Sequence, residues 1–162
     1  MTILDTLITD RSDSDVELYN LLKDKIQQRT ATAEEWDLWE ATQLKAAYNA
    51  HDLNRIASAM DCISKLIADY GYMVKGSPKS DWKEGDIPRT DEIKEFNKAI
   101  QSILHNFPPT DSSISPPKSL SNVTIKMAND LEKLFISIPN TLERISFAYE
   151  YCGTVFSGEV NI

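Results

Sequence analysis

The sequence predicts an all-α fold: a helical bundle of about five helical segments with a long irregular loop and a short C-terminal extended strand. Three observations predict it. Apolar residues recur at alternating steps of three and four along several stretches, as on one face of an α-helix. Capping residues precede these stretches and turn residues follow them. Strand-like patterns are confined to short pieces. The 162 residues fit a single domain, 1–162, that can bury its own core.

The first two elements are expected to be an arm and a short helix. Residues 1–12 are predicted to form an extended N-terminal arm that crosses another surface or pairs as an edge strand. Ser14 with Glu17, three residues on, has the pattern of a capping box and is expected to start the first helix. Its apolar face consists of Leu18, Leu22 and Ile26.

A second capping box, Thr32 with Glu35, predicts another helix, which we expect to run to Tyr48. Its first turn is acidic, which suits the helix dipole. Trp36 and Trp39 lie one turn apart on this short amphipathic helix.

The stretch 46–71 has the strongest helical pattern and is expected to form the core of the fold. Asn49 with Asp52 resembles a cap for its start, with His51 as the alternative start, and its final glycine should end it. Two neighbouring apolar rows predict cover on two sides, with Ile63 central. Asp52 and Arg55 are expected to bond to each other at the corner before this helix. The two rows are Leu53, Ile56, Met60, Ile63 and Ile67, and Ala59, Cys62, Leu66 and Tyr70.

The middle of the chain alternates loop and helix. Residues 72–89 are expected to be irregular, with a short strand at 72–74 and with Trp82 anchoring the loop on the helices. The next helix is expected to begin at Thr90 and to end before the proline pair that follows Phe107. Residues 108–122 form a Pro/Ser-rich linker that is either mobile or laid along the surface.

The last helix is expected to follow a short strand at 123–125, with Asn129 and Glu132 as a capping box. Its apolar register continues across Pro139, which indicates either one kinked helix or two separate segments. Gly153 is expected to stop it, leaving residues 153–162 as an extended tail.

Composition excludes several function classes. The net charge of −8 argues against nucleic-acid binding and against docking on anionic lipid, because both need a basic surface. The N-terminus has no signal-peptide pattern, and no apolar run is long enough to span a membrane. Two cysteines without a second pair make no disulfide framework.

Catalytic and cofactor motifs are absent from the sequence. The two histidines, His51 and His105, fall at expected helix boundaries, and neither shares a nucleophile or zinc-ligand spacing with Cys62 or Cys152. Phosphate-binding glycine motifs do not occur. We therefore expect no enzymatic activity, no cofactor, no metal and no small-molecule substrate. Cys62 is interpreted as a core thiol.

An acidic cluster near the N-terminus resembles a calcium loop. It lacks the turn glycine and the bidentate glutamate at the twelfth position, so helix capping is favoured and a metal is the alternative. The cluster consists of Asp10, Asp13, Asp15 and Glu17.

Four residues are candidates for partner binding. Trp36 and Trp39 are of the type enriched at interface hot spots, although core packing is the commoner role for tryptophan in a domain of this size. Phe156 and Val160 belong to the expected C-terminal strand, and such extended ends can add a strand to a neighbouring protein.

Several stretches together resemble a group of helical domains in virion structural and tail proteins of phages and prophages from Firmicutes-type gut bacteria. The distinctive pieces are AYNAHDLNRI (47–56), DWKEGDIP (81–88) and FSGEV (156–160). The similarity covers nearly the whole chain, but the Pro-rich segment 108–118 and Pro139 depart from the pattern. None of these pieces is a catalytic motif.

The resemblance implies a non-enzymatic virion component, made in the bacterial cytoplasm and located in the particle. Its expected partners are other tail or baseplate proteins and further copies of itself. An alternative is a small acidic helical protein that binds a host or regulatory protein. An enzyme of an unfamiliar kind is the third possibility.

Overall fold

The computed structural model describes residues 2–40, 44–45, 48–83 and 85–155, with side chains up to Tyr149. Within these residues the chain is helical and contains no strand, which confirms the all-α fold class. The elements are η1 (Ile3–Thr6), α1 (Asp13–Gln27), α2 (Ala33–Glu40), α3 (Ala50–Ala68), α4 (Thr90–Asn106), η2 (Leu120–Asn122) and α5 (Ile125–Val155), where η marks a 3-10 turn. Phe156 and Val160 lie outside the described residues.

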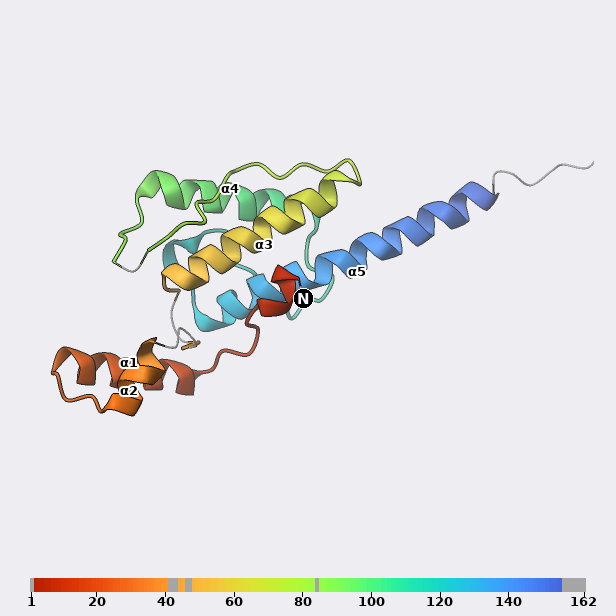
Figure 1. The fold of residues 1–162 in the computed structure, drawn as a ribbon. Coiled ribbons are helices and arrows are strands. Elements are labelled where there is room, and N and C mark those ends of the chain that lie inside the picture. The colour runs from red at the N-terminus through yellow and green to blue at the C-terminus, as the bar shows by residue number, and fades with distance from the viewer. Residues whose placement is uncertain (1, 41–43, 46–47, 84, 156–162) are drawn as a thin grey trace, which may run out of the picture.

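Three helices form the body of the molecule. α3, α4 and the first half of α5 pack side by side, and η1 lies against α3 and α5 (Figure 1). Helices α1 and α2 form a hairpin on one side of this body, and the far end of α5 extends away from it on another. The molecule is therefore a compact core with two projections.

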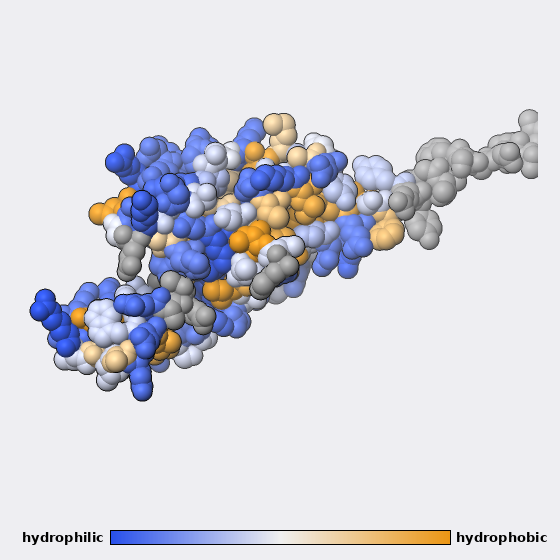
Figure 2. Space-filling model, in the orientation of Figure 1, coloured by the Kyte–Doolittle hydropathy of each residue, from blue (hydrophilic) through white to orange (hydrophobic). Residues whose placement is uncertain are grey.

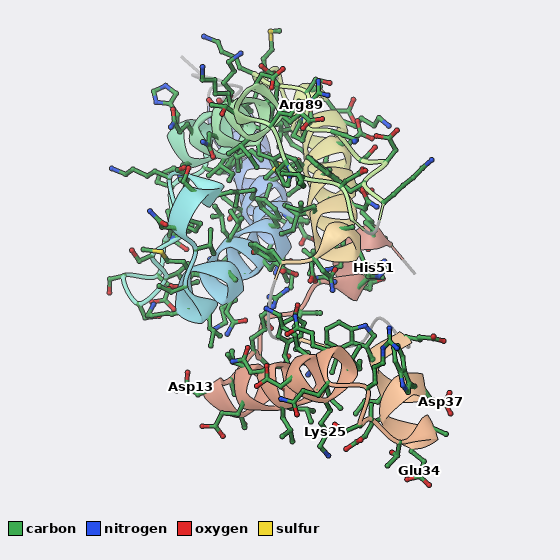
Figure 3. All side chains as sticks on the ribbon, turned by 90° about the vertical axis from the view of Figure 1, so that its left-hand side faces the viewer. Asp13, Lys25, Glu34, Asp37, His51 and Arg89 are labelled. Atoms are coloured by element: carbon green, nitrogen blue, oxygen red, sulfur yellow. The ribbon has the colours of Figure 1, made fainter. Side chains whose placement is uncertain are left out.

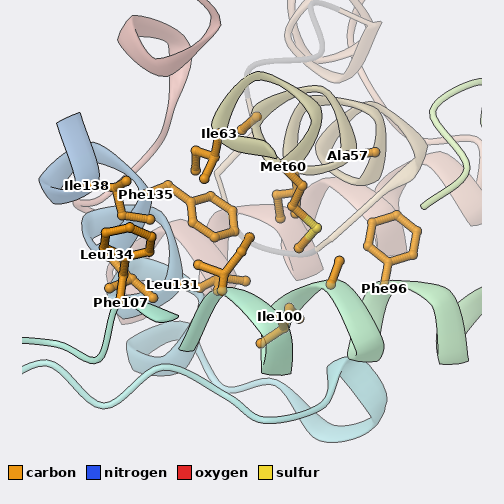
Figure 4. Packing of buried hydrophobic residues seen from close by; sticks show 14 of the residues in the cluster. Ala57, Met60, Ile63, Phe96, Ile100, Phe107, Leu131, Leu134, Phe135 and Ile138 are labelled. Carbon is orange, nitrogen blue, oxygen red and sulfur yellow. The ribbon is translucent and has the colours of Figure 1, made fainter. Parts of the chain in front are cut away.

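The core consists of aliphatic and aromatic side chains from α3, α4 and α5 (Figure 4). Ile63 is fully buried at 0% exposure, as the sequence predicted. The first predicted row of α3 is buried throughout, whereas the second row becomes more exposed from Ala59 to Tyr70. Burying one such side chain contributes about 1.5–3 kcal/mol. Besides Ile63, the most buried large side chains of this core are Ile56, Met60, Ile67, Phe96, Ile100, Ile103, Leu131, Leu134, Phe135 and Ile138.

Local signals explain where α3 begins and ends. The Asn49 side chain accepts a hydrogen bond from the Asp52 amide at 2.9 Å, and the Asp52 carboxylate accepts one from the Asn49 amide at 3.2 Å. This capping box was predicted. Gly71 follows the helix with a φ of 81°, which a residue without a β-carbon adopts readily.

The loop between α3 and α4 is fixed by Trp82. Its indole nitrogen donates to the Lys79 carbonyl at 2.9 Å. The Asn54 side chain bonds to both backbone groups of Trp82, at 2.8 and 2.9 Å. Trp82 is thus the anchor that the sequence predicted, but the short strand expected at 72–74 does not form.

The Pro/Ser-rich segment 108–122 lies along the surface of the body. The Ser115 amide donates to the Asp130 carboxylate at 2.9 Å, and the Leu120 amide donates to the Asn97 side chain at 2.9 Å. Pro117 is buried. Residues 123–125 are not a strand, because η2 ends just before them and α5 begins at Ile125.

The last helix is continuous. α5 contains Pro139 in its interior and continues through Gly153 to Val155, so the predicted stop at Gly153 is wrong. The Ser137 hydroxyl donates to the Leu134 carbonyl at 2.7 Å and the Thr141 hydroxyl to the Ser137 carbonyl at 3.0 Å, close to the turn that the proline disturbs. Buried apolar residues on both sides of the proline keep the helix in one register.

The N-terminal predictions need three corrections. The arm is not simply extended, because η1 occupies Ile3–Thr6. α1 starts at Asp13, capped by Ser12, whose amide donates to the Asp15 carboxylate at 2.8 Å; Ser14 is already inside the helix. The predicted capping box between Thr32 and Glu35 is present. However, α2 ends at Glu40, and residues 44–45 and 48–49 are not helical.

Ile63→Ala is expected to lower the free energy of unfolding by about 2–5 kcal/mol, because it leaves a cavity where α3, α4 and α5 meet. Urea denaturation measures this. Met73→Ala, at an exposed side chain, serves as the control and should change stability little. A loss below about 1 kcal/mol for Ile63→Ala would place the centre of the core elsewhere.

Candidate interaction surfaces

Four charged side chains meet inside the body, and we call them the charge cluster: Arg11, Asp52, Arg55 and Glu132. Each is at least nine-tenths buried, and Glu132 is 0% exposed. They come from the N-terminal arm, from α3 and from α5, so the cluster joins three parts of the chain that are far apart in sequence.

The two arginines alternate with the two carboxylates. Arg11 Nη2 lies 2.7 Å from Glu132 Oε1 and 3.5 Å from Asp52 Oδ1. Arg55 Nη2 lies 2.5 Å from Asp52 Oδ1 and 3.4 Å from Glu132 Oε1. The predicted bond between Asp52 and Arg55 is confirmed, but it belongs to a larger, electrically balanced group. Such balance is what allows charges to be buried, because an unpaired buried charge is very costly.

The cluster also fixes the backbone of the arm. The Ile8 amide donates to Glu132 Oε2 at 2.6 Å, and Arg11 Nη1 donates to the Ile8 carbonyl at 2.7 Å. The Asn129 side chain bonds to both the amide and the carbonyl of Arg11, at 3.1 and 2.9 Å. Asn129 and Glu132 therefore do not cap a helix, as the sequence predicted; they lie inside α5 and hold the arm.

Tyr48 covers one side of the cluster. Its ring lies 5.3 Å from the Arg11 guanidinium carbon, within cation–π range. Burial, reinforced by the charge of Glu132, raises the pKa of the Tyr48 hydroxyl above its ordinary value, so this group stays protonated at physiological pH. Because the cluster is closed to solvent and its charges balance, its role is structural.

Helices α1 and α2 form the first projection. Tyr19 stacks on Trp39 with ring centroids 5.3 Å apart, and Lys25 forms an ion pair with Glu35. Of the two tryptophans predicted to bind a partner, Trp39 thus packs within the hairpin, whereas Trp36 is 40% exposed. Figure 3 shows the hairpin set apart from the body.

A cleft of about 670 Å³ lies between the hairpin and the body. Two of its polar side chains are used locally: the Asn49 side chain caps α3, and the Asn54 side chain holds Trp82. His51 lies at the exposed start of α3 and lines the cleft, whereas His105 does not line it.

The far end of α5 is the second projection. Phe147 is 55% exposed and Tyr149 74% exposed, although both are large and largely apolar. In Figure 2 this part of the helix shows orange and pale patches beside blue ones. This surface was not predicted from the sequence.

The described residues contain neither a metal-binding cluster nor a membrane-spanning helix. No group of three or more histidine, cysteine, aspartate or glutamate side chains is placed to hold a metal ion there. Among the same residues, no helix is long and apolar enough to cross a membrane. Cys62, interpreted as a core thiol, is only partly buried.

Comparison of the chain with protein-family models, with curated proteins and with solved structures gave no match. The resemblance to phage virion proteins therefore stays a prediction from the sequence.

Glu132→Gln is expected to lower the free energy of unfolding by about 3–5 kcal/mol, because it leaves two buried arginines short of negative charge. Chemical denaturation with both circular dichroism and tryptophan fluorescence measures it. Asp61→Asn is the control, since Asp61 forms an exposed ion pair with Lys65 at 2.7 Å and should contribute almost nothing. Equal stabilities for the two variants would contradict the role given to the cluster.

Proposed function

We propose that this protein is a non-enzymatic structural component of a phage virion, which assembles with further copies of itself and with tail or baseplate proteins. The observation that carries the proposal is the projecting end of α5. A helical end without tertiary contacts gains little stability of its own, because isolated helices shorter than about 12–15 residues are marginal in water. A partner protein that packs against this end of α5 supplies the stabilising contacts that the body does not provide.

The side chains of this end support assembly. Phe147 and Tyr149 are two residues apart, so they lie on nearly opposite sides of the helix. A helix that is apolar on both sides suits insertion between neighbours better than contact with one flat surface. Aromatic side chains of this kind dominate the binding energy of protein interfaces.

The non-enzymatic part of the proposal is supported by the sequence, which contains no catalytic or cofactor-binding motif. The virion setting is supported by the sequence resemblance alone, and it is tested directly by mass spectrometry of purified particles from a lysogen or host that carries the gene. The protein should be found in the particles at a stoichiometry comparable to that of tail proteins. Its absence from them would overturn the proposal.

Phe147→Ser combined with Tyr149→Ser is expected to reduce self-association, because it removes the apolar surface of the projecting helix. Light scattering should give a mass above the 18.3 kDa of one chain for the unaltered protein and a smaller mass for the variant. Met73→Ser with Ile87→Ser removes two exposed apolar side chains from the loop of the body and is the matched control. A control that dissociates as readily as the variant would contradict assembly through α5.

A further inference from the structure

The negative charge of the protein is concentrated on the α1–α2 hairpin. Residues 13–40 contain eight acidic and three basic side chains, so they hold five of the eight net negative charges of the chain. In Figure 3, Asp13, Glu34 and Asp37 lie on the outer sides of the hairpin. Much of the electrostatic field of the protein therefore originates from this one projection.

Most of these carboxylates have no basic partner. Among the described residues, Glu35 is the only one of the eight that forms an ion pair, with Lys25. The charge of the others is therefore not neutralised within the protein. A basic partner that neutralised them would be favoured electrostatically, and it would associate faster.

The hairpin also exposes large apolar side chains among these charges. Leu21 lies four residues after Glu17 and three residues before Asp24. This spacing places all three side chains on one side of α1. The same helix exposes Leu18 beside Leu21. On α2, the exposed apolar residues are Trp36, with Glu40 one turn later, and Leu38, with Glu34 one turn earlier.

The base of the hairpin is held on both sides. Asp10 just before α1 pairs with Lys45 after α2, at 2.7 Å. Arg11 is fixed in the charge cluster, and Tyr48 packs over it. The buried Arg11 fixes the base at the start of α1, which lowers the entropic cost of binding a partner, whereas the exposed Asp10–Lys45 pair adds little.

We propose that the α1–α2 hairpin binds a basic amphipathic helix of a partner protein, whose apolar side chains contact Leu18 and Leu21 while its lysines or arginines pair with Glu17 and Asp24. The pattern of exposed leucines edged by free carboxylates is complementary to a helix with leucine and lysine at helical spacing. A second copy of the chain is disfavoured as the occupant, because it would bring the same negative charge to this surface. The proposal rests on the proposed assembly function and names the chemistry of one partner.

The test uses the full-length protein and a synthetic helical peptide with leucines on one face and lysines beside them. Isothermal titration calorimetry measures its binding at low and at raised salt. Two control peptides accompany it: one with glutamate in place of every lysine, and one with the same composition but without the helical spacing. The basic amphipathic peptide should bind at least about tenfold more tightly than either control, and salt should weaken its binding.

Two variants locate the site on the hairpin. Leu18→Ser with Leu21→Ser, and Glu17→Lys with Asp24→Lys, should each weaken binding of the basic peptide by about tenfold or more. Their matched controls are Met73→Ser with Ile87→Ser and Asp69→Lys with Glu143→Lys, which make the same changes at exposed positions outside the hairpin. Circular dichroism checks that all four variants keep the helical content of the unaltered protein.

Each outcome decides the proposal. Binding that is lost in the hairpin variants and kept in their controls supports it. Equal weakening in the hairpin and control variants, equal affinity for the three peptides, or association of the hairpin only with a second copy overturns it. The variant at Phe147 and Tyr149 should bind the peptide normally, so a failure of assembly through α5 and a failure of hairpin binding are separate results.

Discussion

The buried charge cluster is the interaction on which the arrangement of the molecule depends. Arg11, Asp52, Arg55 and Glu132 connect the N-terminal arm to α3 and α5 in a space closed to water. Their charges balance, and removal of any one would leave a buried charge without compensation. The apolar core holds α3, α4 and α5 together, and Leu4 and Leu7 of the arm pack against it. The charge cluster adds a polar connection at the far end of the arm, where the backbone at Ile8 and Arg11 is held by α5.

Both projections follow from this construction. The hairpin leaves the body immediately after Arg11, and the chain that follows α2 enters α3 just before Asp52, so members of the charge cluster lie where the chain leaves the body and where it re-enters it. The body needs only the first half of α5, as the buried series from Leu131 to Leu142 shows, and the rest of the helix extends beyond it. Two surfaces with different chemistry, one acidic with scattered leucines and one aromatic, are thereby presented in different directions (Figure 1).

The sequence predicted the structural features that depend on residues close together in the chain. It missed the features that depend on contacts between residues far apart in the chain. The periodicity of α3 and α4 and the Asn49–Asp52 cap are local, and they were predicted. Asn129 and Glu132 have the spacing of a capping box, but their actual partner is Arg11, over a hundred residues earlier, which no local pattern reveals. The ends of α2 and α5 were also misjudged: α2 ends at Glu40 although no glycine or proline follows it closely, and α5 continues past Gly153 on its projecting end. For the candidate surfaces, the sequence pointed to Trp36 but not to Phe147 or Tyr149, since exposure on a projecting helix is set by the shape of the body.

Native-state hydrogen exchange at the arm tests the central claim most directly. The amides of Ile8 and Arg11 belong to no helix, and their hydrogen-bond acceptors are the side chains of Glu132 and Asn129. If the charge cluster fixes the arm to the body, these two amides exchange as slowly as amides in the middle of α3 and lose that protection in the Glu132→Gln variant. Exchange at the rate of an unstructured segment in the unaltered protein would contradict the account.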